Sequence, residues 1–348
     1  MRRYGNLWDK IISKENFKAA YKKAIKGKSS RKNIIKFQKN AETNLEKVRQ
    51  LLISKEFKNS RYFEKTIYEP KERIIYILPF NPDRIIQHAL MNVISPILDK
   101  MFISDSYVCR VGKGIHKGSK RTMEFVRRNK YCLKCDIRKF YPSIDQQIMF
   151  DIICRKIKCK DTLRLIETIL FSFPGGKNVP IGNLTSQWFG NLYMNELDQY
   201  VKTKLKVKDY VRYCDDFCFF HNDKETLKDI AEKVRVFLYE KLKLTFSKCD
   251  LFQVKRGVDY LGYRHFNNYI LLRKSAVKRL KKRLEKLPRL YEKGLIDIIQ
   301  YMSSIASALG WAKKANAHNL TTKLGLKELF LKLKKESKNA RIESKKIC

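Results

Sequence analysis

Residues 211–220 read VRYCDDFCFF and place two adjacent acids, Asp215 and Asp216, between two short apolar runs. β-Branched and aromatic residues favour strands and Asp favours tight turns, so this segment predicts a β-hairpin with acids at its tip. Successive side chains of a strand point to opposite faces, so both acids reach one ligand only where the backbone turns. Two neighbouring carboxylates repel each other unless a divalent cation lies between them. The hairpin is therefore a candidate metal site, with an ordinary acidic turn as the alternative.

The charge of the chain points to a polyanionic partner. Its 348 residues include 76 Lys and Arg against 35 Asp and Glu, a net charge of +41, and 44% are hydrophobic. The basic residues are spread along the whole chain, which indicates a folded body with a positive surface rather than a basic tail. A membrane is the competing partner, but no apolar stretch reaches the roughly 18 to 20 residues that span a bilayer. Residues 1–20 lack the apolar core of a signal peptide. We expect nucleic acid as the partner, no membrane contact and a cytoplasmic location.

The order of the expected elements is that of an α+β protein. Apolar residues at helical spacing predict a buried helix over 84–101. The elements expected after it are a strand, two helices, the acidic hairpin, a helix and a strand, at 131–137, 145–158, from Gly182 to about 201, 211–220, 224–240 and 243–247. This is the order of a split βαβ (ferredoxin-like) sheet. Ser275 is expected to cap a later helix with a basic face that suits a phosphate backbone.

A further acid stands at the end of an expected strand. In residues 134–145, KCDIRKFYPSID, the strand ends near Asp136, and Tyr141 follows five residues later. An acid at a strand end and acids on a neighbouring hairpin can share two metal ions about 3.5 to 4 Å apart, which is the geometry of metal-assisted phosphoryl transfer. Asp136 and Asp215 are expected to ligate both ions, with the carbonyl of Ile137 as a further ligand. Asp216 is expected as a ligand or as a hairpin acid.

These two segments together resemble the palm of reverse transcriptases. Residues 73–90 and 106–116 are similar to fingers segments of the retron and group II intron enzymes, 260–263 (YLGY) resembles the primer grip, and 309–320 resembles a thumb motif. The resemblance implies an RNA-directed DNA polymerase of right-hand type that uses two Mg²⁺ ions, with Mn²⁺ as the alternative metal. It divides the chain into a helical extension at 1–57, fingers at 58–130, palm and primer-grip hairpin at 131–270 with a fingers-type insertion around 145–180, a helical thumb at 271–330 and a basic disordered tail at 331–348.

The resemblance also implies roles for single residues. Lys248 is expected to protonate the departing pyrophosphate, with a simple phosphate-facing Lys as the alternative. Arg73, assisted by Lys71, is expected to clamp the triphosphate, and Tyr141 to exclude a 2′-hydroxyl. Primer or template contacts are expected from Tyr213, Leu261, Gly262, Tyr263, Arg84 and Arg110. For the two arginines, structural ion pairing is the alternative.

Residues 179–187, VPIGNLTSQ, narrow the resemblance. Where most reverse transcriptases have Gln-Gly and later Ser-Pro, Ile181 replaces the Gln and Gln187 replaces the Pro. This pair of departures resembles the enzymes of diversity-generating retroelements, which implies error-prone copying of a template-repeat RNA opposite adenines. An Ile near the nascent base pair offers only dispersion contact where Gln forms hydrogen bonds, and losing about 1 kcal/mol of differential contact relaxes selection about fivefold. The swap does not explain why adenine is the affected base.

The partners implied are template RNA, a cDNA primer terminus, deoxynucleoside triphosphates and a small basic accessory variability protein, single or oligomeric. The resemblance points to a bacterial or phage-encoded protein. Within the same class, the alternatives are a retron-like, group II intron-derived or antiphage-defence reverse transcriptase. From a different class, the alternative is a non-catalytic RNA-binding protein.

Overall fold

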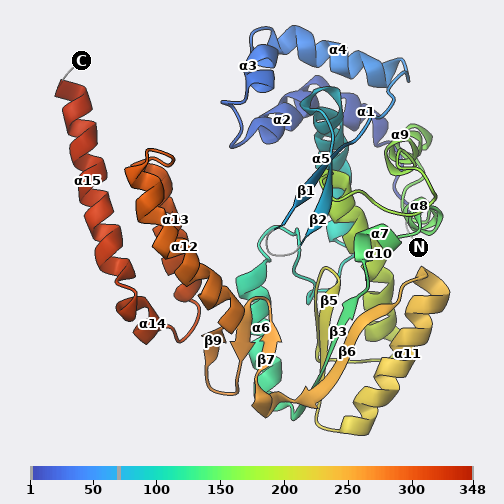
Figure 1. Ribbon diagram of the computed structural model, residues 1–348. Coiled ribbons are helices and arrows are strands. Elements are labelled where there is room, and N and C mark those ends of the chain that lie inside the picture. Colours follow the sequence, from blue (N-terminus) through green and yellow to red (C-terminus); the bar gives the residue numbers. More distant parts are fainter. Residues whose placement is uncertain (1–2, 69–71, 347–348) are drawn as a thin grey trace. The chain divides into compact units, whose positions relative to one another are not determined.

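The computed structural model describes residues 3–68 and 72–346 and divides into two compact units (Figure 1). The larger unit consists of Met1–Gly114, Lys134–Phe219 and Lys228–Asp250. The smaller unit consists of Ile115–Leu133, Phe220–Leu227 and Leu251–Cys348. Because each unit is assembled from segments that are distant in sequence, the continuous domain boundaries expected from the sequence stay predictions.

The larger unit begins with short helices, a two-stranded sheet and a long apolar helix. These elements are α1 (Trp8–Ile12), α2 (Lys14–Ile25), α3 (Lys32–Gln38), α4 (Ala41–Ile53), β1 (Phe63–Ile67), β2 (Arg73–Ile77) and α5 (Ile85–Asp99). Helix α5 confirms the helix predicted over 84–101 and contains Pro96. Its buried residues include Ile86, Leu90 and Ile94, and the helix packs against α2.

A four-stranded sheet carries the acids, in the strand order β4–β5–β3–β6. The strands are β3 (Tyr131–Ile137), β4 (Tyr210–Tyr213), β5 (Asp216–His221) and β6 (Phe246–Gln253). The helices between them are α7 (Phe140–Ser143), α8 (Gln146–Cys154), α9 (Lys160–Leu170), α10 (Leu184–Gln199) and α11 (Lys224–Leu242). The predicted mixture of helix and sheet is confirmed. The last strand begins later than predicted, because Lys243 has a left-handed φ of 53° that interrupts the extended chain before Phe246.

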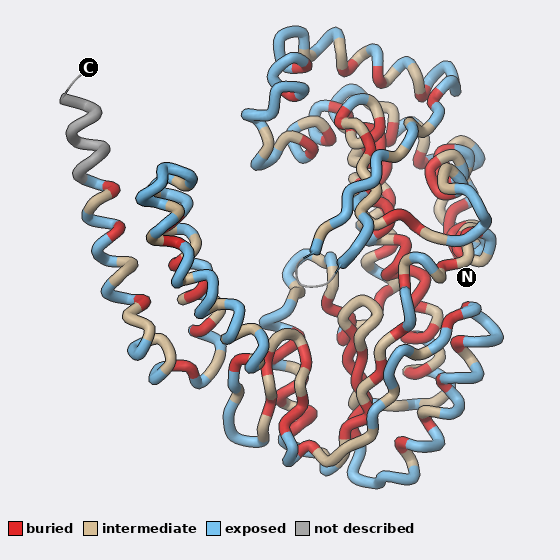
Figure 2. Tube along the Cα trace, viewed as in Figure 1, coloured by how far each residue is buried: buried red, intermediate tan, exposed pale blue. Residues whose placement is uncertain are grey.

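The core of the larger unit lies where α10 and α11 run side by side along this sheet (Figure 1). The Tyr200 ring stacks on Phe237 with 4.3 Å between ring centroids, and the Tyr193 hydroxyl donates to the carbonyl of Leu242 over 2.7 Å. Buried residues concentrate in β3, β4, β5, α5 and α10 (Figure 2). The strands that position Asp136 and Asp215 are therefore part of a densely packed core.

The smaller unit combines a three-stranded sheet with helices. Its elements are α6 (Ile115–Arg128), β7 (Val258–Tyr260), β8 (Tyr263–His265), β9 (Ile270–Leu272), α12 (Lys274–Glu292), α13 (Ile298–Ala312), α14 (His318–Lys323) and α15 (Leu326–Lys346). The strands pair in the order β7–β8–β9. One apolar cluster joins Tyr263 and Leu272 to Ala312, and a second joins Leu287 and Ile305 to α15.

Two expectations for this unit are corrected. Helix α12 begins at Lys274 with Arg273 as its N-cap, ahead of the expected cap Ser275, because the Arg273 N–H donates to the carbonyl of Gly262 and ends the extended chain there. The basic end expected to be disordered from 331 continues as helix α15 through Lys346. Leu333 is 3% exposed and belongs to the second cluster, and the following Lys and Glu residues favour a helix.

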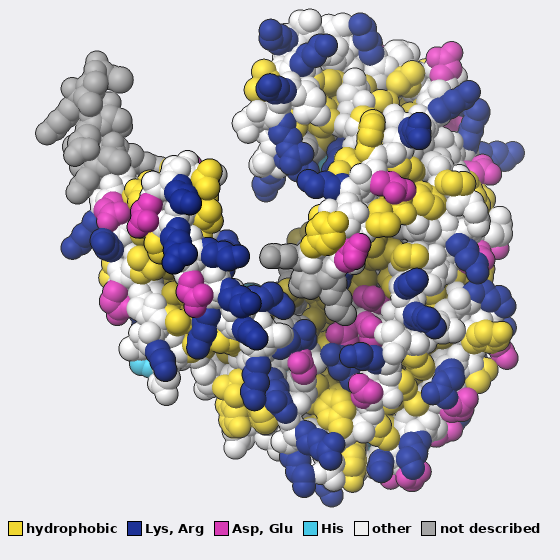
Figure 3. Space-filling model, viewed as in Figure 1, with side chains coloured by type: hydrophobic (Ala, Val, Ile, Leu, Met, Phe, Trp, Pro, Cys, Tyr) yellow, Lys and Arg dark blue, Asp and Glu magenta, His cyan; other side chains and the backbone are white. Residues whose placement is uncertain are grey.

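The surface carries the excess of positive charge. On the face seen in Figure 3, Lys and Arg side chains are spread over both units, with fewer acids among them. On α12, Lys278, Arg279 and Lys282 are exposed while Leu287 is buried, as the basic-face prediction requires. No helix in the part of the chain that the structure describes is long and apolar enough to cross a membrane.

His265 on β8 gives a pH test of the smaller unit. The residue is 0% exposed, Nε2 lies 2.8 Å from the Ser119 hydroxyl, and Nδ1 lies 3.1 Å from the carbonyl of Val258. Burial lowers the pKa of His265 from 6.5 to about 4. Between pH 6.5 and pH 4, His265 is protonated in the unfolded chain but stays neutral in the folded chain. The free energy of unfolding therefore decreases as the pH falls from 6.5 to 4, by up to about 3 kcal/mol.

We expect His265→Gln to remove this part of the pH dependence, measured as the free energy of unfolding in urea at pH 7, 5 and 4. The exposed His318→Gln is the control and should keep the wild-type slope. Equal slopes for the two variants would contradict the assignment.

Candidate active site

Two acids, Asp136 and Asp215, meet where β3 ends beside the β4–β5 hairpin. Asp136 is the next-to-last residue of β3. In the hairpin, Tyr213 pairs with Asp216, which leaves Cys214 and Asp215 as a two-residue turn. The backbone N–H that follows Asp136 donates to the carbonyl of Asp215 over 3.3 Å. The structure therefore brings the predicted hairpin and the predicted strand-end acid together.

The carboxylates of Asp136 and Asp215 interact electrostatically. Burial raises the pKa of Asp215, the charge of Asp136 raises it further, and Arg73 acts in the opposite direction. The Ser247 hydroxyl on β6 donates to Asp136 Oδ2 over 2.5 Å and lies 3.2 Å from the Asp136 carbonyl oxygen. Two acids are thus held together in a partly buried place, which costs free energy until a cation joins them.

The donor set of this site fits a hard divalent cation. Among the residues that the structure describes, no group of three or more His, Cys, Asp or Glu side chains could hold a metal ion. Mg²⁺ needs fewer protein ligands, because one or two carboxylates commonly bind it while waters and substrate phosphates complete its shell. Asp136 and Asp215 supply two such carboxylates, and a cation would favour the ionised form of Asp215 that burial disfavours. The residues present therefore fit Mg²⁺ or Mn²⁺, with the carbonyl of Ile137 as a predicted ligand.

Three further candidate site residues lie on the strands next to Asp136 and Asp215. Asp216 Oδ2 lies 3.6 Å from the ammonium of Lys134 on β3, which favours the hairpin-acid alternative for Asp216 over a ligand role. Lys248 is exposed on β6, directly after Ser247. Tyr213 is half-buried at the end of β4. The roles of Lys248 in proton transfer and of Tyr213 in holding a primer stay predictions.

Candidate nucleotide contacts come from β2 and the loop before α10. Arg73 is exposed at the start of β2 and acts electrostatically on Asp215. In the same strand, the Tyr76 N–H donates to the carbonyl of Ile181 over 2.8 Å. This hydrogen bond ties the strand of Arg73 to the segment in which the sequence departs from most reverse transcriptases. Lys71 lies outside the described residues.

Tyr141 in α7 places a bulky ring beside the acidic turn. Its hydroxyl lies 3.6 Å from Sγ of Cys214, the neighbour of Asp215. A Cβ on Gly190 of α10 would lie 3.1 Å from the Tyr141 ring, so the absence of a side chain at Gly190 makes room for that ring. Burial, and next the Cys214 thiol, raise the pKa of Tyr141, so the phenol stays neutral. Its action as a steric gate toward the sugar stays a prediction.

Residues 106–110 contact α10. One of these contacts is to Gln187, the second residue at which the sequence differs from most reverse transcriptases. The Cys109 thiol donates a weak hydrogen bond to Gln187 Oε1 over 3.5 Å, and Asn191 Nδ2 donates to the carbonyl of Val108 over 2.7 Å. Gln187 is exposed and Ile181 is half-buried. Their effect on nucleotide selection stays a prediction.

Arg110 and Arg84 have different surroundings. Arg110 Nε donates to Asp99 Oδ1 over 2.6 Å, and Nη1 donates to two backbone carbonyls at 2.6 and 3.0 Å. Because these donors are used inside the protein, the structural alternative is favoured over a template contact for Arg110. Arg84 Nε lies 3.4 Å from the carbonyl of Leu78, and burial together with the charge of Arg31 lowers the pKa of Arg84. That excess of positive charge keeps Arg84 a candidate for phosphate contact.

The expected primer-grip hairpin is present in the smaller unit. Tyr260 pairs with Tyr263, so Leu261 and Gly262 form a two-residue turn with φ of 55° and 85°, as a type I′ turn requires. The Tyr263 ring is 0% exposed in the core, and its hydroxyl donates to the carbonyl of Trp311 over 3.3 Å, which favours a structural role in holding the hairpin in place. Its predicted contact with a primer or template stays a prediction.

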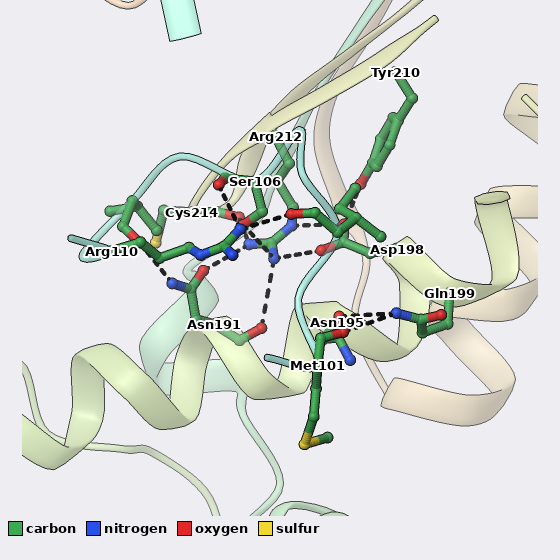
Figure 4. Close-up of polar contacts among 12 residues, drawn as sticks. Met101, Ser106, Arg110, Asn191, Asn195, Asp198, Gln199, Tyr210, Arg212 and Cys214 are labelled. Atoms are coloured by element: carbon green, nitrogen blue, oxygen red, sulfur yellow. Dashed lines mark hydrogen bonds and ion pairs between the residues drawn. The ribbon is translucent and has the colours of Figure 1, made fainter. Parts of the chain in front are cut away.

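A buried polar network that no sequence motif predicts lies under the acidic turn (Figure 4). Arg212 on β4 donates to both carboxylate oxygens of Asp198 on α10, over 2.8 and 2.6 Å, and to the carbonyl of Cys214 over 2.9 Å. Both charged side chains are 0% exposed. An Arg within an apolar strand signals that a buried acid must accompany it, but the sequence does not say which acid.

The chain belongs to the reverse transcriptase (RNA-dependent DNA polymerase) family, which matches residues 64–265. That range contains Asp136, Asp215 and the Arg212 network.

Curated relatives are similar over part of their length. The retron Ec73 reverse transcriptase of Escherichia coli is 29% identical over 181 residues, which cover 48% of this chain and 52% of that protein. The retron Ec83 reverse transcriptase of E. coli is 25% identical over 179 residues, covering 49% and 56%. Protein YkfC of E. coli K12 is 23% identical over 236 residues, covering 54% and 61%. The chain thus spans about half the length of the curated relatives it matches. Among solved structures, apo telomerase from Candida tropicalis truncated from its C-terminal domain aligns with a TM-score of 0.48 at 14% identity, covering 63% of this chain and 55% of that one.

Gly182 provides a test of the tie between β2 and the loop before α10. Its φ is 128°, and a Cβ there would lie 2.2 Å from the carbonyl oxygen of Tyr76, a backbone atom. We expect Gly182→Ala to lower the free energy of unfolding by about 1–3 kcal/mol, because β2 must move away. Gly176→Ala is the control: φ is 68° there, but no atom lies within 4 Å of the added Cβ. An equal loss in both variants would show that only backbone strain matters.

Proposed function

We propose that this chain is an RNA-directed DNA polymerase that extends a primer on an RNA template. The observation that supports this most is the juxtaposition of Asp136 and Asp215 inside the range that matches the reverse transcriptase family. The positive surface suits a nucleic-acid partner (Figure 3). In this proposal, residues 58–130 act as fingers, 131–270 as palm and primer-grip hairpin, and 271–330 as thumb, after a helical extension at 1–57.

The proposed chemistry is attack of the primer 3′-hydroxyl on the α-phosphate of a deoxynucleoside triphosphate, with pyrophosphate as the leaving group. Two Mg²⁺ ions, or Mn²⁺, would lower the pKa of the attacking hydroxyl and balance charge on the leaving group when bound. Asp136 and Asp215 would hold them. Arg73 would hold the triphosphate, and the Tyr141 ring would exclude a 2′-hydroxyl. Lys248, exposed beside Ser247, would give a proton to the pyrophosphate.

Removal of one carboxylate tests the enzymatic proposal. We expect Asp215→Ala to lower primer extension on an RNA template to background, because one acid cannot hold the cations, while RNA affinity stays within about twofold. Asp229→Ala, an exposed acid on α11, is the control and should extend normally. Incorporation of labelled deoxynucleotides by Asp215→Ala at the wild-type rate would contradict the metal assignment. An inactive but RNA-binding wild type would favour the non-catalytic alternative.

We also propose that the enzyme is of the diversity-generating retroelement type and works with a small basic accessory protein. Support for the type comes from Ile181 and Gln187, which stand where a hydrogen-bonding Gln and a Pro are typical of reverse transcriptases. A retron-like enzyme is the second candidate, because two of the similar curated proteins carry that name. Two near-identical repeats beside the gene that differ only at adenines would distinguish the first candidate. The cytoplasmic location stays a prediction.

Residue 181 allows a direct test of fidelity. We expect Ile181→Gln to lower the overall misincorporation rate by about fivefold, because the amide restores about 1 kcal/mol of discrimination by hydrogen bonding. Ile181→Leu keeps an apolar side chain of equal size and should leave the error rate unchanged. The measurement is sequencing of cDNA made on one RNA with each template base. Equal error rates in both variants would remove Ile181 as a source of low fidelity.

A further inference from the structure

Arg212 uses its guanidinium to link three segments of the larger unit (Figure 4). Nε and Nη2 donate to the two oxygens of Asp198 on α10 over 2.8 and 2.6 Å. Nη1 donates to Asn191 Oδ1 on the same helix over 3.1 Å, and Nη2 donates to the Ser106 hydroxyl over 3.1 Å. Nη2 also donates to the carbonyl of Asn191 over 3.5 Å, and Nη1 donates to the carbonyl of Cys214 over 2.9 Å. One side chain therefore joins α10 and the loop at residue 106 to the peptide that precedes Asp215.

Fold stability alone does not explain such a pair. Desolvating a guanidinium and a carboxylate costs several kcal/mol per ion, and well-packed apolar residues of similar volume often give equal or greater stability. Burial lowers the pKa of Arg212, but the Asp198 carboxylate outweighs burial and keeps the guanidinium charged. The planar fork fixes direction as well as distance, which an apolar pair does not. The geometry of the Arg212–Asp198 pair is thus suited to holding neighbouring groups in a fixed orientation.

The turn at Cys214 and Asp215 has a backbone conformation that its surroundings must hold in place. Cys214 has a φ of 61°, a left-handed value that is uncommon for a residue with a side chain and that persists only when the surroundings enforce it. Its carbonyl is held by Arg212, and its thiol lies 3.6 Å from the Tyr141 hydroxyl. Asp215 is the next residue, so the orientation of the Cys214 peptide sets the direction of the Asp215 carboxylate.

We infer that Arg212, locked in place by Asp198, is a positioning residue for nucleotidyl transfer, which rests on the proposed function. The pair holds the Cys214 carbonyl and thereby fixes the Asp215 carboxylate opposite Asp136. It also fixes the catalytic turn to α10, the helix whose first turn contains Gln187. Misplacement of a reacting group by about 1 Å costs about a hundredfold in rate, so loss of the pair acts on kcat rather than on nucleotide affinity.

The decisive variant replaces both ions, Arg212→Met with Asp198→Leu. We expect a melting temperature within a few degrees of wild type, a kcat for single-nucleotide addition about a hundredfold lower, and a KM for the nucleotide within about threefold. Tyr210→Phe is the matched control, because the Tyr210 hydroxyl donates to the same Asp198 carboxylate over 2.8 Å while Tyr210 is not among the residues that hold the Cys214 carbonyl. It should keep kcat within about threefold of wild type. A folded double variant with wild-type kcat would overturn the inference.

Two further measurements keep the test decisive. Arg212→Lys retains the charge for Asp198 but loses the fork that reaches the Cys214 carbonyl, so it should also lower kcat at unchanged KM, and wild-type kcat in this variant would overturn the inference if the double variant does not fold. Amide hydrogen exchange of residues 213–217 should be faster in the double variant than in Tyr210→Phe. This readout does not depend on catalysis, so an inactive wild type would refute the proposed function, whereas equal exchange in the two variants would refute the positioning role.

Discussion

A fully buried ion pair, Arg212 with Asp198, supports the acidic turn on which the proposed chemistry depends. Asp198 lies near the end of α10 and Arg212 on β4, so the pair fastens a helix to the edge of the four-stranded sheet. The same guanidinium holds the carbonyl of Cys214, whose left-handed backbone would otherwise relax. The position of Asp215 is therefore determined by a helix and a strand together, and not by the hairpin alone.

Above this support, the structure concentrates negative charge in a protein that is otherwise strongly positive. Burial and the neighbouring Asp136 raise the pKa of Asp215, while Arg73 reduces that effect. The two acids suit a cation, and the positive charge of Arg73 suits an anionic substrate. The hydrogen bond from Ser247 orients Asp136 from β6. The net charge of +41 suits the nucleic-acid partner of the proposed function.

Much of the fold followed from local pattern, and the parts that did not depend on tertiary contacts. Two short apolar runs around an acidic turn predicted the hairpin, and Asp136 at a strand end predicted its partner, because both signals are local. Arg212 could be recognised as anomalous in its strand, but only the packing of α10 identifies Asp198 as its counter-ion. Tyr263 resembled a primer contact by motif, yet its ring is buried, because the turn at Leu261 and Gly262 directs it into the core. Helix α15, which continues through Lys346, depends on Leu333 packing against α13. The Lys-rich composition of this segment gives no sign of that packing.

In the proposed function, Asp136 and Asp215 together hold the two divalent cations. Fe²⁺ bound in place of Mg²⁺ reduces added hydrogen peroxide to hydroxyl radicals, with ascorbate regenerating Fe²⁺, and these radicals cut the backbone near the metal ligands, so mapping of the cleaved fragments reports the site directly. We expect cuts near both residue 136 and residue 215, both suppressed by excess Mg²⁺ and both lost in Asp215→Ala. Cleavage at one of the two positions without the other, or cleavage that Asp215→Ala leaves unchanged, would contradict the claim.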